Sequence, residues 1–201
     1  MKSKFQLKFN NLAPDFEVQT TSGELVRLST LWANQPLLLA FIRHFGCPQC
    51  KLMLSELQQS LNDFERHGIG LAIITQGKPE ETREFCLQFA PGMRCLSDPD
   101  HKVYTAYGLG HGNLVQTFLS PEIWKGNSRA REKGFIPQMP PAGQDALLMS
   151  GIFIIGPDGR VRFPYYYDNI ADHPALPQLM QGFLGTPWDQ PFDGPIKPEH
   201  E

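Results

Sequence analysis

The sequence contains no long hydrophobic run and no recognisable export signal. No apolar stretch approaches the roughly 20 residues that a transmembrane helix requires, so no membrane partner is expected. Residues 1–8 carry positive charge, but no apolar stretch of signal-peptide length follows them. We therefore expect the protein to stay in the cytoplasm.

Cysteine and excess charge are also scarce. The 201 residues include only 4 cysteines, too few for a disulfide scaffold, and the net charge of −3 leaves no basic surface that would favour nucleic acid. Cytosolic thiols are kept reduced, so two cysteines spaced Cys-x-x-Cys there are more often catalytic or metal-binding than structural. Small or neutral partners fit this composition better than polyanions do.

The hydrophobic and charged fractions, 41% and 19%, are those of a soluble globular chain. We expect one domain over residues 1–184. Within it, residues 109–149 are too long for an ordinary connection, which indicates an insertion that covers something. A proline-rich tail follows over residues 185–201, where four prolines disfavour helix and central strand.

The hydrophobic pattern predicts an α/β fold with a mixed central sheet flanked by helices. An N-terminal hairpin (16–20 with 24–28), buried strands (37–42, 70–75 and 94–97) and a C-terminal hairpin (152–155 with 161–163) form the expected sheet. Expected helices cover 47–66, 78–91, 100–107, 121–133 and 174–184. Strands that alternate with helices indicate right-handed parallel crossovers in the middle of the sheet.

Cys47-Pro48-Gln49-Cys50 stands where the first buried strand gives way to the long helix. With Cys47 as N-cap, Pro48 takes the first helical position and Cys50 lies one turn on, so both sulfurs share a face. The helix N-terminus lowers the pKa of a thiol there and favours the reactive thiolate. This geometry predicts that Cys47 attacks a peroxide or disulfide and that Cys50 resolves the product, with no metal or cofactor.

Three cationic or titratable side chains flank the pair. Arg43, His44 and Lys51 would each favour the Cys47 thiolate if they pointed inward, and His44 could instead act as an acid or base. Cys86 and Cys95 fall in a helix and a strand, where we expect small buried side chains rather than redox partners.

The main alternative is a binding or regulatory module without turnover. His44, Cys47 and Cys50 have a spacing that suits zinc, and Cys95, His101 or His111 would complete a tetrahedral set. Against this, zinc-binding Cys-x-x-Cys pairs usually lie in loops, not at the start of a long helix.

Several segments together resemble the peroxiredoxin-like branch of the alkyl hydroperoxide reductase and thiol-specific antioxidant (AhpC/TSA) group, in the thioredoxin-like superfamily. The resemblance spans about residues 12–184. It rests on Ala13-Pro14-Asp15-Phe16, Arg43-His44-Phe45-Gly46-Cys47-Pro48-Gln49-Cys50, Leu96-Ser97-Asp98-Pro99, Tyr107-Gly108-Leu109 and the stretch 151–159. The segment around Cys47 is specific to that branch, whereas the others are common to the superfamily.

The resemblance implies a thioredoxin-like fold with Cys47 in the peroxidatic position. It implies peroxide or a disulfide as oxidant, and thioredoxin, glutaredoxin or glutathione as reductant. A homodimer through the edge that carries Tyr165-Tyr166-Tyr167 is left open.

The sequence also departs from that pattern. His44 and Ala40 stand where peroxiredoxins carry Thr or Ser and Pro, and Ser150-Gly151 stands where they carry a second activating Arg. Those groups orient the peroxide and stabilise charge along its O–O bond. Their replacement predicts slow peroxide turnover.

Overall fold

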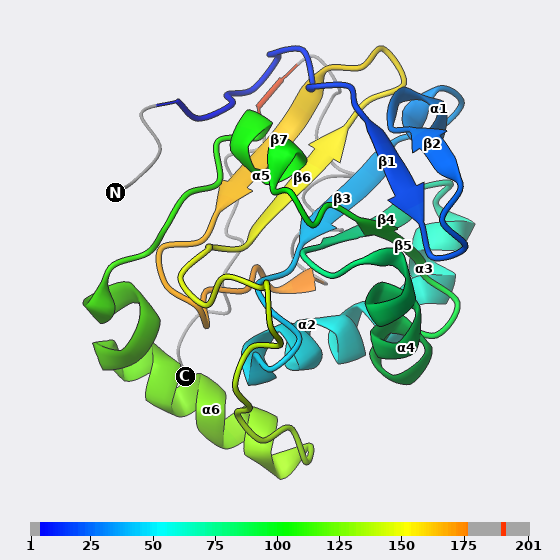
Figure 1. Ribbon diagram of the computed structural model, residues 1–201. Coiled ribbons are helices and arrows are strands. Elements are labelled where there is room, and N and C mark those ends of the chain that lie inside the picture. The colour runs from blue at the N-terminus through cyan, green and yellow to red at the C-terminus, as the bar shows by residue number, and fades with distance from the viewer. Residues whose placement is uncertain (1–4, 177–189, 192–201) are drawn as a thin grey trace.

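The computed structural model describes residues 5–176 and 190–191, and its core is a seven-stranded sheet in the order β2-β1-β5-β4-β3-β6-β7 (Figure 1). The strands are β1 (Glu17–Thr20), β2 (Leu25–Arg27), β3 (Leu37–Phe41), β4 (Gly70–Thr75), β5 (Arg94–Ser97), β6 (Gly151–Ile155) and β7 (Val161–Tyr166). The helices are α1 (Ser29–Trp32), α2 (Pro48–Gln59), α3 (Leu61–Arg66), α4 (Pro79–Phe89), α5 (Lys102–Ala106), the π-helix η1 (Val115–Leu119) and α6 (Pro121–Glu132). The predicted mixed sheet flanked by helices is confirmed.

β3 lies inside the sheet and is buried along its whole length. It pairs parallel with β4 and antiparallel with β6. Leu38 and Ala40 face the core cluster that contains α2, whereas Leu39 and Phe41 face the cluster on the other side, with Tyr104 and Tyr107. A strand that is buried on both faces needs an unbroken apolar run, which explains the sequence pattern there.

The helix expected over 47–66 is two helices. α2 ends at Gln59 and α3 begins at Leu61, because the regular helical conformation is interrupted at Ser60 (φ −94°, ψ 1°). Gly68, with a φ of 64°, follows the second helix as expected. The predicted last helix (174–184) and the tail (185–201) lie largely outside the described residues.

The expectation for Cys86 and Cys95 was wrong in one respect. Both are buried as expected, but they form a disulfide with each other, with their Cα atoms 6.6 Å apart. Cys86 lies near the end of α4 and Cys95 in β5. The short turn through Gly92 folds the chain back so that the two side chains meet, which the spacing alone does not reveal.

The insertion expected over residues 109–149 is largely helical in its first part and irregular, with several turns, in its last. η1 and α6 project from the body of the molecule, and α6 packs against α2 (Figure 1). The Gln49 side chain of α2 donates a 2.7 Å hydrogen bond to the Asn127 side chain of α6. Every helix within the described residues is too short or too polar to cross a bilayer.

Candidate active site

Cys47 is positioned by the turn between β3 and α2. Its backbone is extended (φ −77°, ψ 116°), it forms the N-cap of α2, and Pro48 follows as the first helical residue. Its carbonyl accepts the amide of Lys51 at 3.3 Å, so the helix begins where the sequence predicted. Cys50 therefore lies one turn further along the same helix, and both sulfurs are free thiols.

Arg43 contacts both sulfurs. Its Nη1 atom lies 3.4 Å from Cys47 Sγ, and its backbone amide donates to Cys50 Sγ at 3.2 Å. The two cysteines are each only 1% exposed, so the guanidinium acts on them in an environment with little solvent screening. Arg43 is the predicted site residue that the structure joins most directly to the pair.

The two thiols differ strongly in acidity. A hydrogen bond from the Cys50 thiol, together with the charge of Arg43, outweighs burial and lowers the pKa of Cys47 to about 6. Burial raises the pKa of Cys50 well above its ordinary value, and the neighbouring Cys47 thiolate raises it further. At neutral pH the pair therefore holds one thiolate, on Cys47, and one thiol, on Cys50.

Lys51 and His44 lie at the same site with different charges. Lys51 Nζ donates to Gln138 at 2.9 Å and lies 4.5 Å above the centre of the Phe89 ring. Burial, with the nearby charges of Arg43 and Lys51, lowers the pKa of His44 to about 4. His44 is therefore neutral at pH 7 and adds no positive charge beside the thiolate; its acid or base role stays a prediction.

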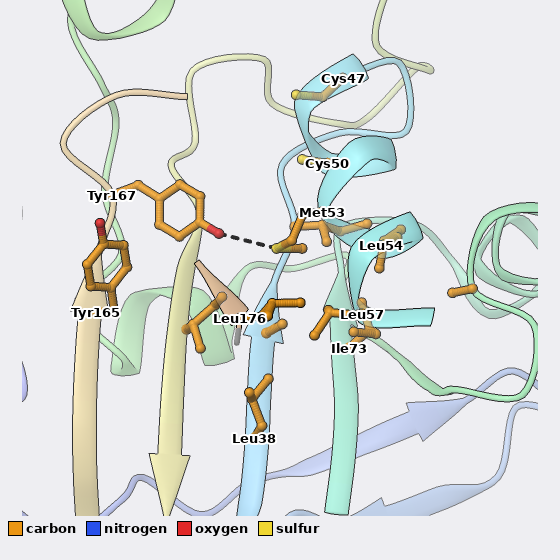
Figure 2. Packing of buried hydrophobic residues seen from close by; sticks show 14 of the residues in the cluster. Leu38, Cys47, Cys50, Met53, Leu54, Leu57, Ile73, Tyr165, Tyr167 and Leu176 are labelled. Carbon is orange, nitrogen blue, oxygen red and sulfur yellow. Dashed lines mark hydrogen bonds between the residues drawn. The ribbon is translucent and has the colours of Figure 1, made fainter. Parts of the chain in front are cut away.

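The side chains that pack behind Cys50 are mostly apolar, but they include one short series of hydrogen bonds. Met53 follows Cys50 on the inner face of α2, and the Tyr167 hydroxyl donates to its sulfur at 3.2 Å (Figure 2). The same hydroxyl lies 3.1 Å from His173 Nδ1. Tyr104 donates to the carbonyls of Ile42 (2.6 Å) and Ile74 (3.0 Å), which fixes the strand ends beneath the site.

Sequence reasoning missed the side chains that cover this site. Gln138 and Gln144 come from residues 134–149, the last part of the insertion, and contact the chain on both sides of Cys47. The unusual length of the insertion indicated that it covers something, but nothing in its local pattern singled out these two glutamines.

The zinc alternative finds no support in the geometry. Across residues 5–176 and 190–191, no three His, Cys, Asp or Glu side chains gather in a way that could hold a metal ion. Cys95, one of the proposed additional ligands, is bonded to Cys86. The described residues thus offer redox chemistry at Cys47 and Cys50 rather than an assembled metal site.

Comparison with known proteins gives the family that the sequence around Cys47 resembles. The model of the AhpC/TSA family matches residues 9–163. The chain belongs to the AhpC/TSA family. It is a thiol oxidoreductase of the peroxiredoxin-like kind, a group that in general uses a peroxide substrate and a thiol reductant.

Individual relatives of this AhpC/TSA protein are distant. The prostamide/prostaglandin F synthase of Danio rerio is 29% identical over 80% of both chains. Peroxiredoxin-like 2C of Bos taurus is 21% identical over 83% of this chain and 76% of its own. A solved peroxiredoxin-like protein from Aquifex aeolicus shares the fold with a TM-score of 0.64 at 16% identity, over 89% of this chain and 87% of that one.

Proposed function

We propose that this protein reduces peroxides through a dithiol cycle, with Cys47 as nucleophile and Cys50 as resolving thiol. The observation that carries the proposal is the asymmetry of the pair. The hydrogen bond from the Cys50 thiol, and after it the charge of Arg43, lower the pKa of Cys47 to about 6, while burial keeps Cys50 protonated. Only the residue at the start of the helix is then ready to attack.

The first step forms a sulfur–oxygen bond. The Cys47 thiolate attacks one oxygen of the peroxide, the O–O bond breaks, and the other oxygen leaves as an alkoxide or hydroxide that takes up a proton. Cys47 is oxidised to a sulfenic acid and the peroxide is reduced to an alcohol or water. Arg43 stays beside the reacting sulfur and stabilises negative charge on the oxygen it gains.

The second step closes the disulfide. The Cys50 sulfur attacks Cys47, the sulfenic oxygen leaves as water with the Cys50 proton, and a Cys47–Cys50 disulfide remains. An external dithiol, or two glutathione molecules, then returns two electrons and two protons. Thioredoxin, glutaredoxin and glutathione are the proposed donors, in the reducing environment of the cytoplasm.

The peroxide is proposed to turn over slowly. His44 is neutral and occupies the position of the hydroxyl residue in standard peroxiredoxins, and Arg43 is the one cationic side chain among the described residues that contacts the Cys47 sulfur. Two relatives are named prostamide/prostaglandin F synthases, and on that basis an organic peroxide belongs in the substrate panel beside hydrogen peroxide.

Mass spectrometry after one equivalent of peroxide tests this proposal. The wild type should lose two hydrogens and yield a Cys47–Cys50 linked peptide. Cys50→Ser should stop at a sulfenic acid on Cys47 that dimedone traps, and Cys47→Ser should remain unmodified at Cys50. Sulfenic acid on Cys50 in the wild type, or no change at either residue, would contradict the assignment.

A further inference from the structure

A segment of the insertion closes over the start of α2. Residues 134–149, which we call the covering segment, contact the chain both before and after Cys47. The Gly46 carbonyl accepts the amide of Gln138 at 3.0 Å, and the Gln138 side chain accepts Lys51 Nζ at 2.9 Å. Phe45 donates its amide to the Gln144 side chain at 2.9 Å. The two glutamines thus hold the covering segment against the peptide that carries the nucleophile.

The far end of the covering segment is fixed more firmly. Arg43 donates to the carbonyl oxygens of Ala146 and Leu148 while it contacts Cys47 Sγ. Asp145 exchanges two hydrogen bonds with the Gln76 side chain, at 2.7 and 3.2 Å. Leu148 is buried in the core. This end is anchored by the protein body and by the same arginine that contacts the thiolate.

The middle of the covering segment is held mainly by hydrogen bonds. Of its large apolar side chains, Ile136 and Met139 are 64% and 87% exposed. Phe135 is half-buried, with its ring centroid 6.1 Å from that of Phe89, so lifting this part away would uncover mainly this one aromatic contact. Gly134 and Gly143 bracket it, both with φ above 80° and with nothing within 4 Å of the position that a β-carbon would take. Segments with few buried apolar contacts open locally at low cost.

The consequence for reactivity follows from the size of the oxidant. A groove of about 740 Å³ reaches Phe45 and Gly46 beside the covering segment, but neither sulfur lines it. A peroxide needs only a small fluctuation to reach a sulfur that is 1% exposed. A protein disulfide must bring a sulfur and its surrounding chain into line with Cys47, which the closed segment prevents.

We propose that residues 135–144, the middle of the covering segment, limit the size of the oxidant that can reach Cys47. While Gln138 and Gln144 hold these residues in place, the site reacts with small peroxides, and it admits a protein disulfide only when they are displaced. The inference rests on the proposed function of Cys47. With a protein disulfide, the Cys47 thiolate attacks one sulfur and the other leaves as thiolate. Cys50 then displaces the first, giving the Cys47–Cys50 disulfide and a partner dithiol, so electrons balance without a further reactant.

The test compares small and bulky probes on the reduced protein at pH 7. The small probes are hydrogen peroxide and iodoacetamide; the bulky ones are a polyethylene-glycol maleimide and insulin as disulfide substrate. In Gln138→Ala/Gln144→Ala, the loss of two hydrogen bonds should raise the bulky rates about tenfold and leave the small ones within about threefold. Gln88→Ala, which lines the same groove from α4, serves as the matched control and should change neither.

A second variant should change the rates with the bulky probes in the opposite direction. Gln138→Glu places a carboxylate against Lys51, which strengthens the closed contact. It should slow the bulky probes and leave the rate with peroxide nearly unchanged. This variant keeps the test informative if the double alanine variant folds poorly.

The outcomes separate the two proposals. If the wild type consumes peroxide but the double variant and wild type react equally with the bulky probes, the covering segment does not select by size and the dithiol cycle stands. If wild-type Cys47 reacts with neither peroxide nor insulin, the proposed function itself fails.

Discussion

The Nη1 atom of Arg43 lies 3.4 Å from Cys47 Sγ, and the remaining guanidinium nitrogens of Arg43 bind the covering segment. One side chain therefore carries both the charge that favours the thiolate and the anchor that keeps the covering segment in place. Oxidation of Cys47 to a disulfide removes the negative charge that Arg43 faces.

Replacing Arg43 should raise the pKa of Cys47. In Arg43→Gln the thiolate loses an adjacent positive charge and a hydrogen bond, so its pKa should rise from about 6 by about one to two units. Thiolate absorbance near 240 nm, titrated in the reduced protein, measures the shift. A Cys47 pKa that does not move would separate Arg43 from the acidity of the thiol.

His44→Gln provides the control for that titration. His44 is neutral at pH 7 because burial lowers its pKa to about 4. Its replacement by another neutral side chain should leave the Cys47 pKa within a few tenths of a unit. A rise as large as that of Arg43→Gln would mean that His44 carries charge at the site after all.

The stability of the reduced protein should depend on pH through Cys47. Its pKa is about 6 in the folded state and roughly 8.5 in an unfolded chain, so between these values the unfolded state binds more protons. Folding stability should therefore rise by about 2 kcal/mol from pH 6 to pH 8 and be lost as pH falls through 6. Urea unfolding of wild type and Cys47→Ser in the same reductant measures this, and the difference between them should flatten below pH 6.

The Cys86–Cys95 disulfide should stabilise the protein without taking part in the cycle. It closes a short loop between α4 and β5, for which the loss of chain entropy in the unfolded state corresponds to roughly 2–3 kcal/mol. Denaturant unfolding of Cys86→Ala/Cys95→Ala and of wild type, with the Cys47–Cys50 pair oxidised in both, measures this difference in the free energy of unfolding. Peroxide turnover should stay within about twofold at a temperature where both are folded; a complete loss of turnover would instead make this pair part of the cycle.

Gly46 offers an independent probe of the covering segment. A β-carbon at Gly46 would lie only 2.7 Å from the carbonyl oxygen of Met139 and even closer to that of Gln138, so backbone must shift. Gly46→Ala should weaken the docking of this segment and speed hydrogen exchange at the Gln138 amide about tenfold or more. Gly23→Ala, at a surface turn where the φ of 86° strains an alanine but nothing lies within 4 Å of the added β-carbon, gives the comparison for a destabilising glycine change that leaves the covering segment untouched.

The start of α2 could be predicted because its cause is local. Cys47 as N-cap and Pro48 as first helical residue are adjacent in sequence, and the apolar run before them allowed only a buried strand. The same holds for both hairpins, where a short turn rich in polar residues and glycine separates two strand-like segments that are close in sequence.

What escaped prediction depends on contacts between distant residues. Gln138 and Gln144 reach Lys51 and Phe45 across more than 80 residues, and the local sequence around them, rich in proline, indicates only an irregular loop. The Cys86–Cys95 bond arises only once α4 folds back onto β5. Propensity and periodicity report local structure, so pairings of this kind become visible only in the folded chain.

The pH dependence of a single peroxide turnover tests the central claim most directly. Stopped-flow measurement of hydrogen peroxide consumption by the reduced wild type should give a rate that rises with pH and is half-maximal near pH 6, the pKa of Cys47. The reaction should be absent in Cys47→Ser. A rate that is half-maximal near pH 8.5, or peroxide consumption that survives in Cys47→Ser, would contradict the assignment of Cys47 as the activated nucleophile.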